Sequence, residues 1–196
     1  MAQDGNGRQS GERGQVAEMV DLFRKGTTFP PMFPSHLLFQ RIPDDLASVI
    51  VNYLRNEERE VYKSTLATLA TGRRLRPVFI QKRPLEGQIS WMKESLKLKN
   101  AESIADQVLQ VWLLKSKKDM VVGFLDAVGI GHDGDGSVEE LPEEIGLEKL
   151  QAGVEKMLEA HPVDEVKLYL HMFQSQRPGG WEQLGKLLEE DERLKL

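Results

Sequence analysis

Residues 101–129 read AESIADQVLQVWLLKSKKDMVVGFLDAVG, and this stretch decides the fold. In its first half, apolar residues recur every three or four positions, which is the spacing of one face of an α-helix. After the charged run KSKKD (115–119) the same spacing returns. The apolar positions are Ile104, Val108, Leu109, Trp112, Leu113, Met120, Val121, Phe124, Leu125 and Val128. Two consecutive helices of this kind must pack on other helices to bury these faces, so the stretch predicts an all-α protein.

Helical periodicity extends in both directions from this stretch. It recurs in the ranges 15–25, 43–54, 61–72, 84–98, 147–158, 163–173 and 181–188. Residues 75–82, LRPVFIQK, have no such period, and we interpret them as an extended linker or the entry to the next helix. Asn100 is the expected N-cap of the helix that follows. The sequence therefore predicts about eight or nine helices of ordinary length and no convincing strand.

Three segments share one plan, a helix followed by a polar turn and a second helix. They cover residues 53–70, 113–129 and 157–173. Stacked helical hairpins of the HEAT type would produce such a repeated pattern. The corresponding valines, Val61, Val121 and Val166, are unevenly spaced, at 60 and then 45 residues. We therefore favour an irregular helical bundle over a short α-hairpin array.

The chain divides into a tail and one body. Residues 1–14 are polar and glycine-rich, which is typical of disorder, and residues 15–196 are expected to form a single helical domain. The glycines in GIGHDGDG (129–136) and the acidic run after them leave a sub-boundary open near residues 130–145. Residues 27–34, TTFPPMFP, predict an extended proline-rich arm. We expect this arm to pack on the body, and the alternative is that Phe29, Met32 and Phe33 bind a partner.

Composition and charge restrict the class of protein. There is no cysteine among 196 residues, which excludes disulfides and thiolate metal sites. The N-terminus lacks a signal peptide, and no apolar run is long enough for a membrane span, so a cytoplasmic protein is expected. The formal net charge is −5. Residues 1–100 carry 16 basic and 11 acidic residues, whereas residues 101–196 carry 10 and 20. We favour two solvated faces of unlike sign, with an electrostatic dipole that orients a partner or a second copy as the alternative.

The loop HDGDGSVEE (132–140) resembles the middle of an EF-hand calcium loop. With Gly136 in sixth place, Asp133 and Asp135 fall at ligand positions. Gly131 then replaces the first carboxylate and Pro142 replaces the final glutamate, so the pattern fails at both ends. We favour a solvated turn, and Asp133 and Asp135 remain the candidate ligands of a divalent cation.

A basic cluster surrounds Val78, Phe79 and Ile80. Its members are Arg73, Arg74, Arg76, Lys82 and Arg83. Basic residues around an aromatic side chain can bind phosphates and stack a base. No nucleic-acid fingerprint is present, and such clusters are commonly solvated faces, so we favour the latter.

No catalytic constellation emerges. Motifs for a nucleophilic serine, a dinucleotide or a nucleoside triphosphate are absent. The histidines His36, His161 and His171 have no nucleophile in a recognisable context, and Trp91, Trp112 and Trp181 are expected in helices of the core. We assign neither catalytic residues nor a cofactor.

The stretch 112–136, together with LYLHMF (168–173) and Trp181, resembles a group of uncharacterised bacterial helical proteins from about Leu37 onward. The resemblance implies a bacterial cytoplasmic setting and brings no catalytic residue. Our leading hypothesis is a non-catalytic protein that binds another protein or itself. The alternatives are a cation-binding protein or metal-dependent enzyme using residues 131–140, and a nucleic-acid binder using residues 73–83.

Overall fold

The computed structural model describes residues 33–177 and 179–196. Within them the chain forms ten α-helices, one short 3-10 helix (η1) and no strand, so the all-α prediction is confirmed. The elements are α2 (Ser35–Arg41), α3 (Asp44–Asn56), α4 (Arg59–Gly72), α5 (Pro77–Gln81), α6 (Leu85–Leu96), η1 (Lys99–Ala101), α7 (Glu102–Ser116), α8 (Lys118–Val128), α9 (Leu147–Ala160), α10 (Val163–Gln174) and α11 (Glu182–Glu190). The expected tail (1–14), the expected helix (15–25) and the arm residues Phe29 and Met32 lie outside the described residues.

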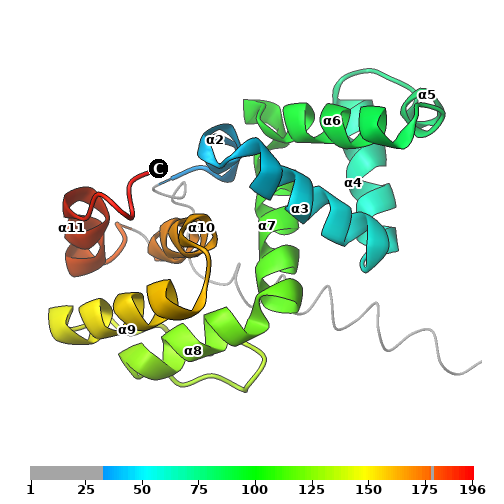
Figure 1. Cartoon of the computed structure of the whole chain (residues 1–196). Helices are drawn as coiled ribbons and strands as arrows, with labels where there is room; N and C mark the ends of the chain where they lie inside the picture. Colours follow the sequence, from blue (N-terminus) through cyan, green and yellow to red (C-terminus); the bar gives the residue numbers. More distant parts are fainter. Residues whose placement is uncertain (1–32, 178) are drawn as a thin grey trace, which may run out of the picture.

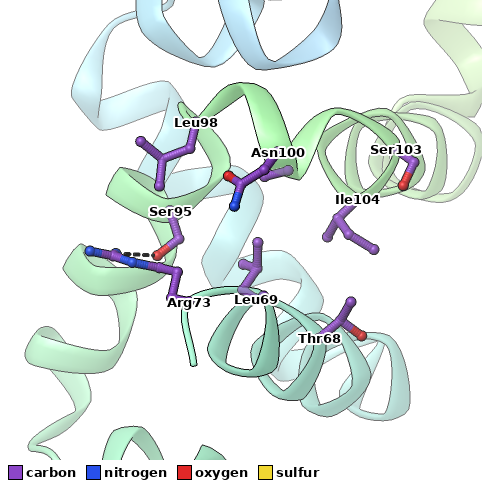
Figure 2. A pocket seen from close by; sticks show the side chains of 10 residues that line it. Thr68, Leu69, Arg73, Ser95, Leu98, Asn100, Ser103 and Ile104 are labelled. Carbon is purple, nitrogen blue, oxygen red and sulfur yellow. Dashed lines mark hydrogen bonds between the residues drawn. The ribbon is translucent and has the colours of Figure 1, made fainter. Parts of the chain in front are cut away.

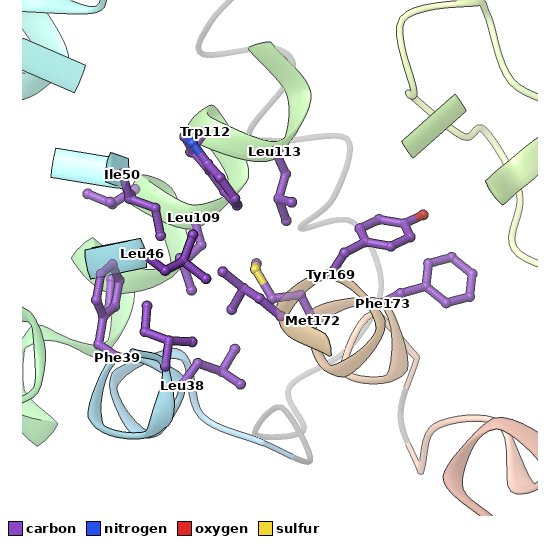
Figure 3. Close-up of a cluster of buried hydrophobic side chains, with 14 of the residues drawn as sticks. Leu38, Phe39, Leu46, Ile50, Leu109, Trp112, Leu113, Tyr169, Met172 and Phe173 are labelled. Carbon is purple, nitrogen blue, oxygen red and sulfur yellow. The ribbon is translucent and has the colours of Figure 1, made fainter. Parts of the chain in front are cut away.

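Helix α7 connects the two parts of a packed helical bundle. It contacts α2, α3, α4 and α6 on one side and continues into α8, which packs along α9 (Figure 1). Leu109 and Trp112 of α7 are fully buried. Figure 3 shows them between Phe39 and Ile50 from the N-terminal helices and Met172 from α10. The stretch that predicted the fold therefore supplies its central helix.

Proline and polar turns end most helices where the sequence predicts. Helices α3 and α4 are separated by Glu57 and Glu58, and α9 ends before His161 and Pro162. A single residue, Lys117, separates α7 from α8, so most of the expected charged turn 115–119 is helical. No helix in the described part of the chain is long and apolar enough to cross a membrane.

Three local predictions are wrong. Residues 77–81 form α5 and are no linker, because Pro77 suits a first helical position and Ile80 is buried against the body. Asn100 lies inside η1, and Ala101 takes the N-cap position of α7. Trp181 precedes α11 as its N-cap residue and is still fully buried.

Two contacts between distant segments fix the ends of the described chain. Glu102 accepts hydrogen bonds from the backbone N–H groups of Ser35 and His36, at 2.8 and 3.0 Å, and its Oε2 lies 2.6 Å from His36 Nδ1. Near the C-terminus, His171 Nε2 lies 3.1 Å from the carbonyl oxygen of Leu194. Both tie a terminal segment to a helix in the middle of the bundle.

Candidate functional site

The C-terminal end of α4 turns the chain outward through an unusual residue. Leu75 N–H donates to the carbonyl of Ala70, and Arg74 N–H donates to that of Thr71. This pair of bonds defines a Schellman motif, whose left-handed position favours glycine. Here Arg74 occupies it, with φ of 57°. Helix α8 ends in the same two bonds with Gly129 in that position.

Helix α5 leaves an apolar surface uncovered. It is a single turn that packs on α4 and α6 through Ile80. Phe79 is 61% exposed and Val78 is 44% exposed, and Leu75 and Leu85 beside them are each 39% exposed. We call residues 73–85 the basic corner. Four of the eight large apolar side chains most exposed in the described chain lie on it.

Exposed cations lie on both sides of these apolar side chains in the sequence. Arg73, Arg74, Arg76, Lys82 and Arg83 are all exposed, and none forms an ion pair within the described residues. Residues 61–85 contain six basic residues and no acidic one. The structure thus keeps all five cations of the predicted cluster exposed along one short segment of the chain, residues 73–83.

Arg73 is held in place, whereas its neighbours extend into solvent. Its Nη1 donates to Ser95 Oγ at 2.9 Å, and its guanidinium lies 5.6 Å from the centre of the Trp91 ring. Ser95 is fully buried and donates in turn to the carbonyl of Trp91 at 2.7 Å. One nitrogen of the guanidinium is therefore engaged, and other N–H groups stay available to a ligand.

A pocket of about 150 Å³ opens beside Arg73 (Figure 2). Figure 2 shows Leu69, Leu98 and Ile104 as its apolar walls, with Ser95, Asn100 and Ser103 adding polar groups. The pocket is open to solvent, and its volume is similar to that of a cavity that holds one benzene molecule. The pocket therefore has room for one side chain of a partner, next to a cation.

The loop before α9 is held by its own hydrogen bonds. Gly134 N–H donates to His132 Nδ1 at 3.0 Å, and Nε2 of the same ring lies 3.1 Å from Asp126 Oδ1. Ser137 N–H donates to Asp135 Oδ1 at 2.8 Å. Hydrogen bonding with the Asp133 side chain, and then with Ser137, lowers the pKa of Asp135.

The proposed cation ligands lie in this loop. Among the described residues, no three acidic or histidine side chains gather as a metal would require. Asp133 and Asp135 are exposed, and both nitrogens of His132 already have partners. In the described residues, no third acidic or histidine side chain joins Asp133 and Asp135 in such a group.

Only one of the three arm residues proposed to bind a partner is described. The ring of Phe33 lies 5.6 Å from that of His171, and the Arg41 guanidinium lies 4.9 Å from the Phe33 ring centre. Phe33 is half-buried by these contacts. This end of the arm packs on the body.

Sequence reasoning found the cations of the basic corner with Val78 and Phe79 among them, and missed the exposed Leu75 and Leu85 and the pocket. In the sequence, α5 is marked only by Pro77 and the short apolar run after it. A run this short shows no periodicity that would distinguish a helix from a strand or a linker. The pocket joins α4, α6, η1 and α7, and no local pattern predicts such a meeting.

Comparisons with known proteins place no further constraint on the site. No family model, no curated protein and no solved structure matches the chain. No family is identified.

Proposed function

We propose that this chain is a non-catalytic interaction protein that binds an acidic protein segment at the basic corner. The observation that carries the proposal is the exposure of Phe79 and Val78 among five cations without ion-pair partners in the described residues. Large exposed apolar side chains with a polar rim are typical of protein-binding surfaces. Cations around them select an acidic partner and speed its encounter.

The side chains of the corner favour a protein over a nucleic acid. Phe79 is its single aromatic residue, and Leu75, Val78 and Leu85 are aliphatic. Aliphatic side chains cannot stack bases as aromatic ones do. They do bury well against apolar side chains of a protein, and the pocket beside Arg73 offers a place for one anchoring side chain.

Fluorescence anisotropy with three labelled probes tests the proposal. The probes are a synthetic peptide of glutamates interspersed with leucine and phenylalanine, a single-stranded oligothymidylate, and vesicles containing phosphatidylserine. We expect the peptide to bind most tightly, and to bind more weakly at about 300 mM than at about 50 mM NaCl. Phe79→Ser and the double variant Arg74→Gln/Arg76→Gln should each weaken binding roughly tenfold.

Lys156→Gln is the matched control, because Lys156 is an exposed cation of α9 outside the corner. It should leave the peptide affinity unchanged. Tighter binding of the oligothymidylate or of the vesicles would contradict the proposal. So would a peptide affinity that is equal in the wild type and both corner variants.

A further inference from the structure

We propose that the acidic segment bound by the basic corner is residues 133–148 of a second copy of this chain, joined head to tail. This inference rests on the proposed function and names its partner. Residues 133–148 contain seven acidic residues and no basic one, the reverse of the balance in residues 61–85. The acidic residues are Asp133, Asp135, Glu139, Glu140, Glu143, Glu144 and Glu148. We call these residues the acidic segment.

The acidic segment matches the corner in more than charge. All seven carboxylates are exposed, and none forms an ion pair within the described residues. Leu147, between Glu144 and Glu148, is 41% exposed. The carboxylates around Leu147 are opposite in charge to the arginines around Phe79. Each surface also carries an exposed apolar side chain, and these can pack against each other.

The two surfaces lie at opposite ends of the molecule. Helix α5 contacts α4 and α6, whereas the acidic segment follows α8 and leads into α9. Figure 1 places α5 at one end and the connection from α8 to α9 at the other. The chain therefore cannot join its own corner to its own acidic segment without unfolding.

Two unlike surfaces on one chain have a defined consequence for assembly. Contact between the corner of one copy and the acidic segment of the next leaves a corner and an acidic segment free at the two ends. Such heterologous contacts repeat, and they produce an open chain of copies unless the rotation closes a ring. Assembly should therefore continue beyond a dimer as the concentration rises.

Sedimentation velocity over a concentration series at low salt is the test, with a charge swap as its decisive arm. We expect the average mass of the wild type to rise past that of a dimer and to fall at high salt. Arg74→Glu/Arg76→Glu alone, and Glu143→Lys/Glu144→Lys alone, should each raise the concentration needed for assembly roughly tenfold or more, because like charges then meet. The variant with all four substitutions should assemble again, since both ends have exchanged sign.

The control Arg74→Lys/Arg76→Lys keeps the charge and should assemble like the wild type. A wild type that stays monomeric, a mass that stops at a dimer, or a four-site variant that stays monomeric would overturn the inference. The proposed function has a separate test. It is contradicted if the chain does not bind the synthetic acidic peptide more tightly than the oligothymidylate and the vesicles. A chain that stays monomeric but still binds this peptide at the corner would therefore contradict head-to-tail assembly and leave the proposed function in place.

Discussion

Arg74 occupies a backbone position where glycine would cost less. A non-glycine residue with left-handed φ is destabilising, and α8 shows that this chain uses glycine at the equivalent place. The hydrophobic residue after it also differs, since Ile130 is buried whereas Leu75 is exposed. The end of α4 thus carries a cation and an apolar side chain where packing alone would favour neither. Backbone strain of this kind is commonly associated with functional surfaces.

Arg74→Gly should therefore stabilise the protein and weaken binding together. Relief of the left-handed strain, reduced by the flexibility of glycine in the unfolded chain, should add about 0.5–1 kcal/mol to the free energy of unfolding. Urea denaturation measures the first effect, and anisotropy with the acidic peptide measures the second. Gly129→Ala in α8 should lose a similar amount. A destabilised Arg74→Gly would show that Arg74 makes contacts this account leaves out.

His171 gives the fold a dependence on pH. Burial lowers the pKa of this imidazole below 6.5, and the bond to the carbonyl of Leu194 only partly opposes the effect. The unfolded chain therefore takes up the proton first as the pH falls, so this contribution to stability is present above pH 6.5 and is lost at lower pH. His171→Gln keeps an N–H donor and does not titrate. In urea denaturation between about pH 8 and pH 5, the wild type should lose more stability than His171→Gln. Parallel curves would contradict the assignment.

At the scale of elements, bonds between segments far apart in sequence hold the short pieces in place. Helix α2 has seven residues and no capping side chain of its own, and Glu102 of α7 supplies its cap. The loop before α9 has no regular structure, and it packs closely on α7 and α8 because Gly136 has no side chain there. These contacts join residues that lie far apart in the sequence, whereas the spacing of apolar residues gives information only about neighbouring positions. They are therefore the part of the fold that the sequence did not predict.

Glu102→Ala should detach α2 from α7. Two backbone N–H groups and the His36 ring would lose a charged acceptor, at a cost of about 1–3 kcal/mol in the free energy of unfolding. Glu94→Ala is the control, because Glu94 forms an exposed pair with Lys97 that should contribute under about 1 kcal/mol. Equal losses in the two variants, measured by chemical denaturation, would remove the capping role of Glu102.

Gly136→Ala should destabilise the loop for two separable reasons. Its φ is +94°, and an added Cβ would lie 2.9 Å from Val121 Cγ1. Gly134→Ala meets only the first penalty, because φ is +83° there and no atom lies within 4 Å of the added Cβ. Gly136→Ala should therefore lose about 1–3 kcal/mol more than Gly134→Ala. Similar losses in thermal or urea denaturation would show that the loop does not press on α8.

At the scale of the whole molecule, the sequence predicted the class of fold and pointed to the cations of the proposed binding surface. Amphipathic spacing found the long helices because their buried faces repeat, as in α7 with Leu109 and Trp112. The cations at 73–83 were visible in the sequence because charge is a property of each residue. The exposure of Phe79 depends on which neighbours α5 meets, and that is decided by packing across the bundle.

The central claim, that the basic corner is the protein-binding surface, is tested most directly by heteronuclear NMR. The ¹⁵N-labelled full chain would be titrated with the synthetic acidic peptide at low protein concentration. We predict that amide shifts concentrate in residues 73–85 and around the pocket beside Arg73, and that they disappear in Phe79→Ser. Shifts confined to α9, α10 and α11, or a spectrum that the peptide leaves unchanged, would contradict the account.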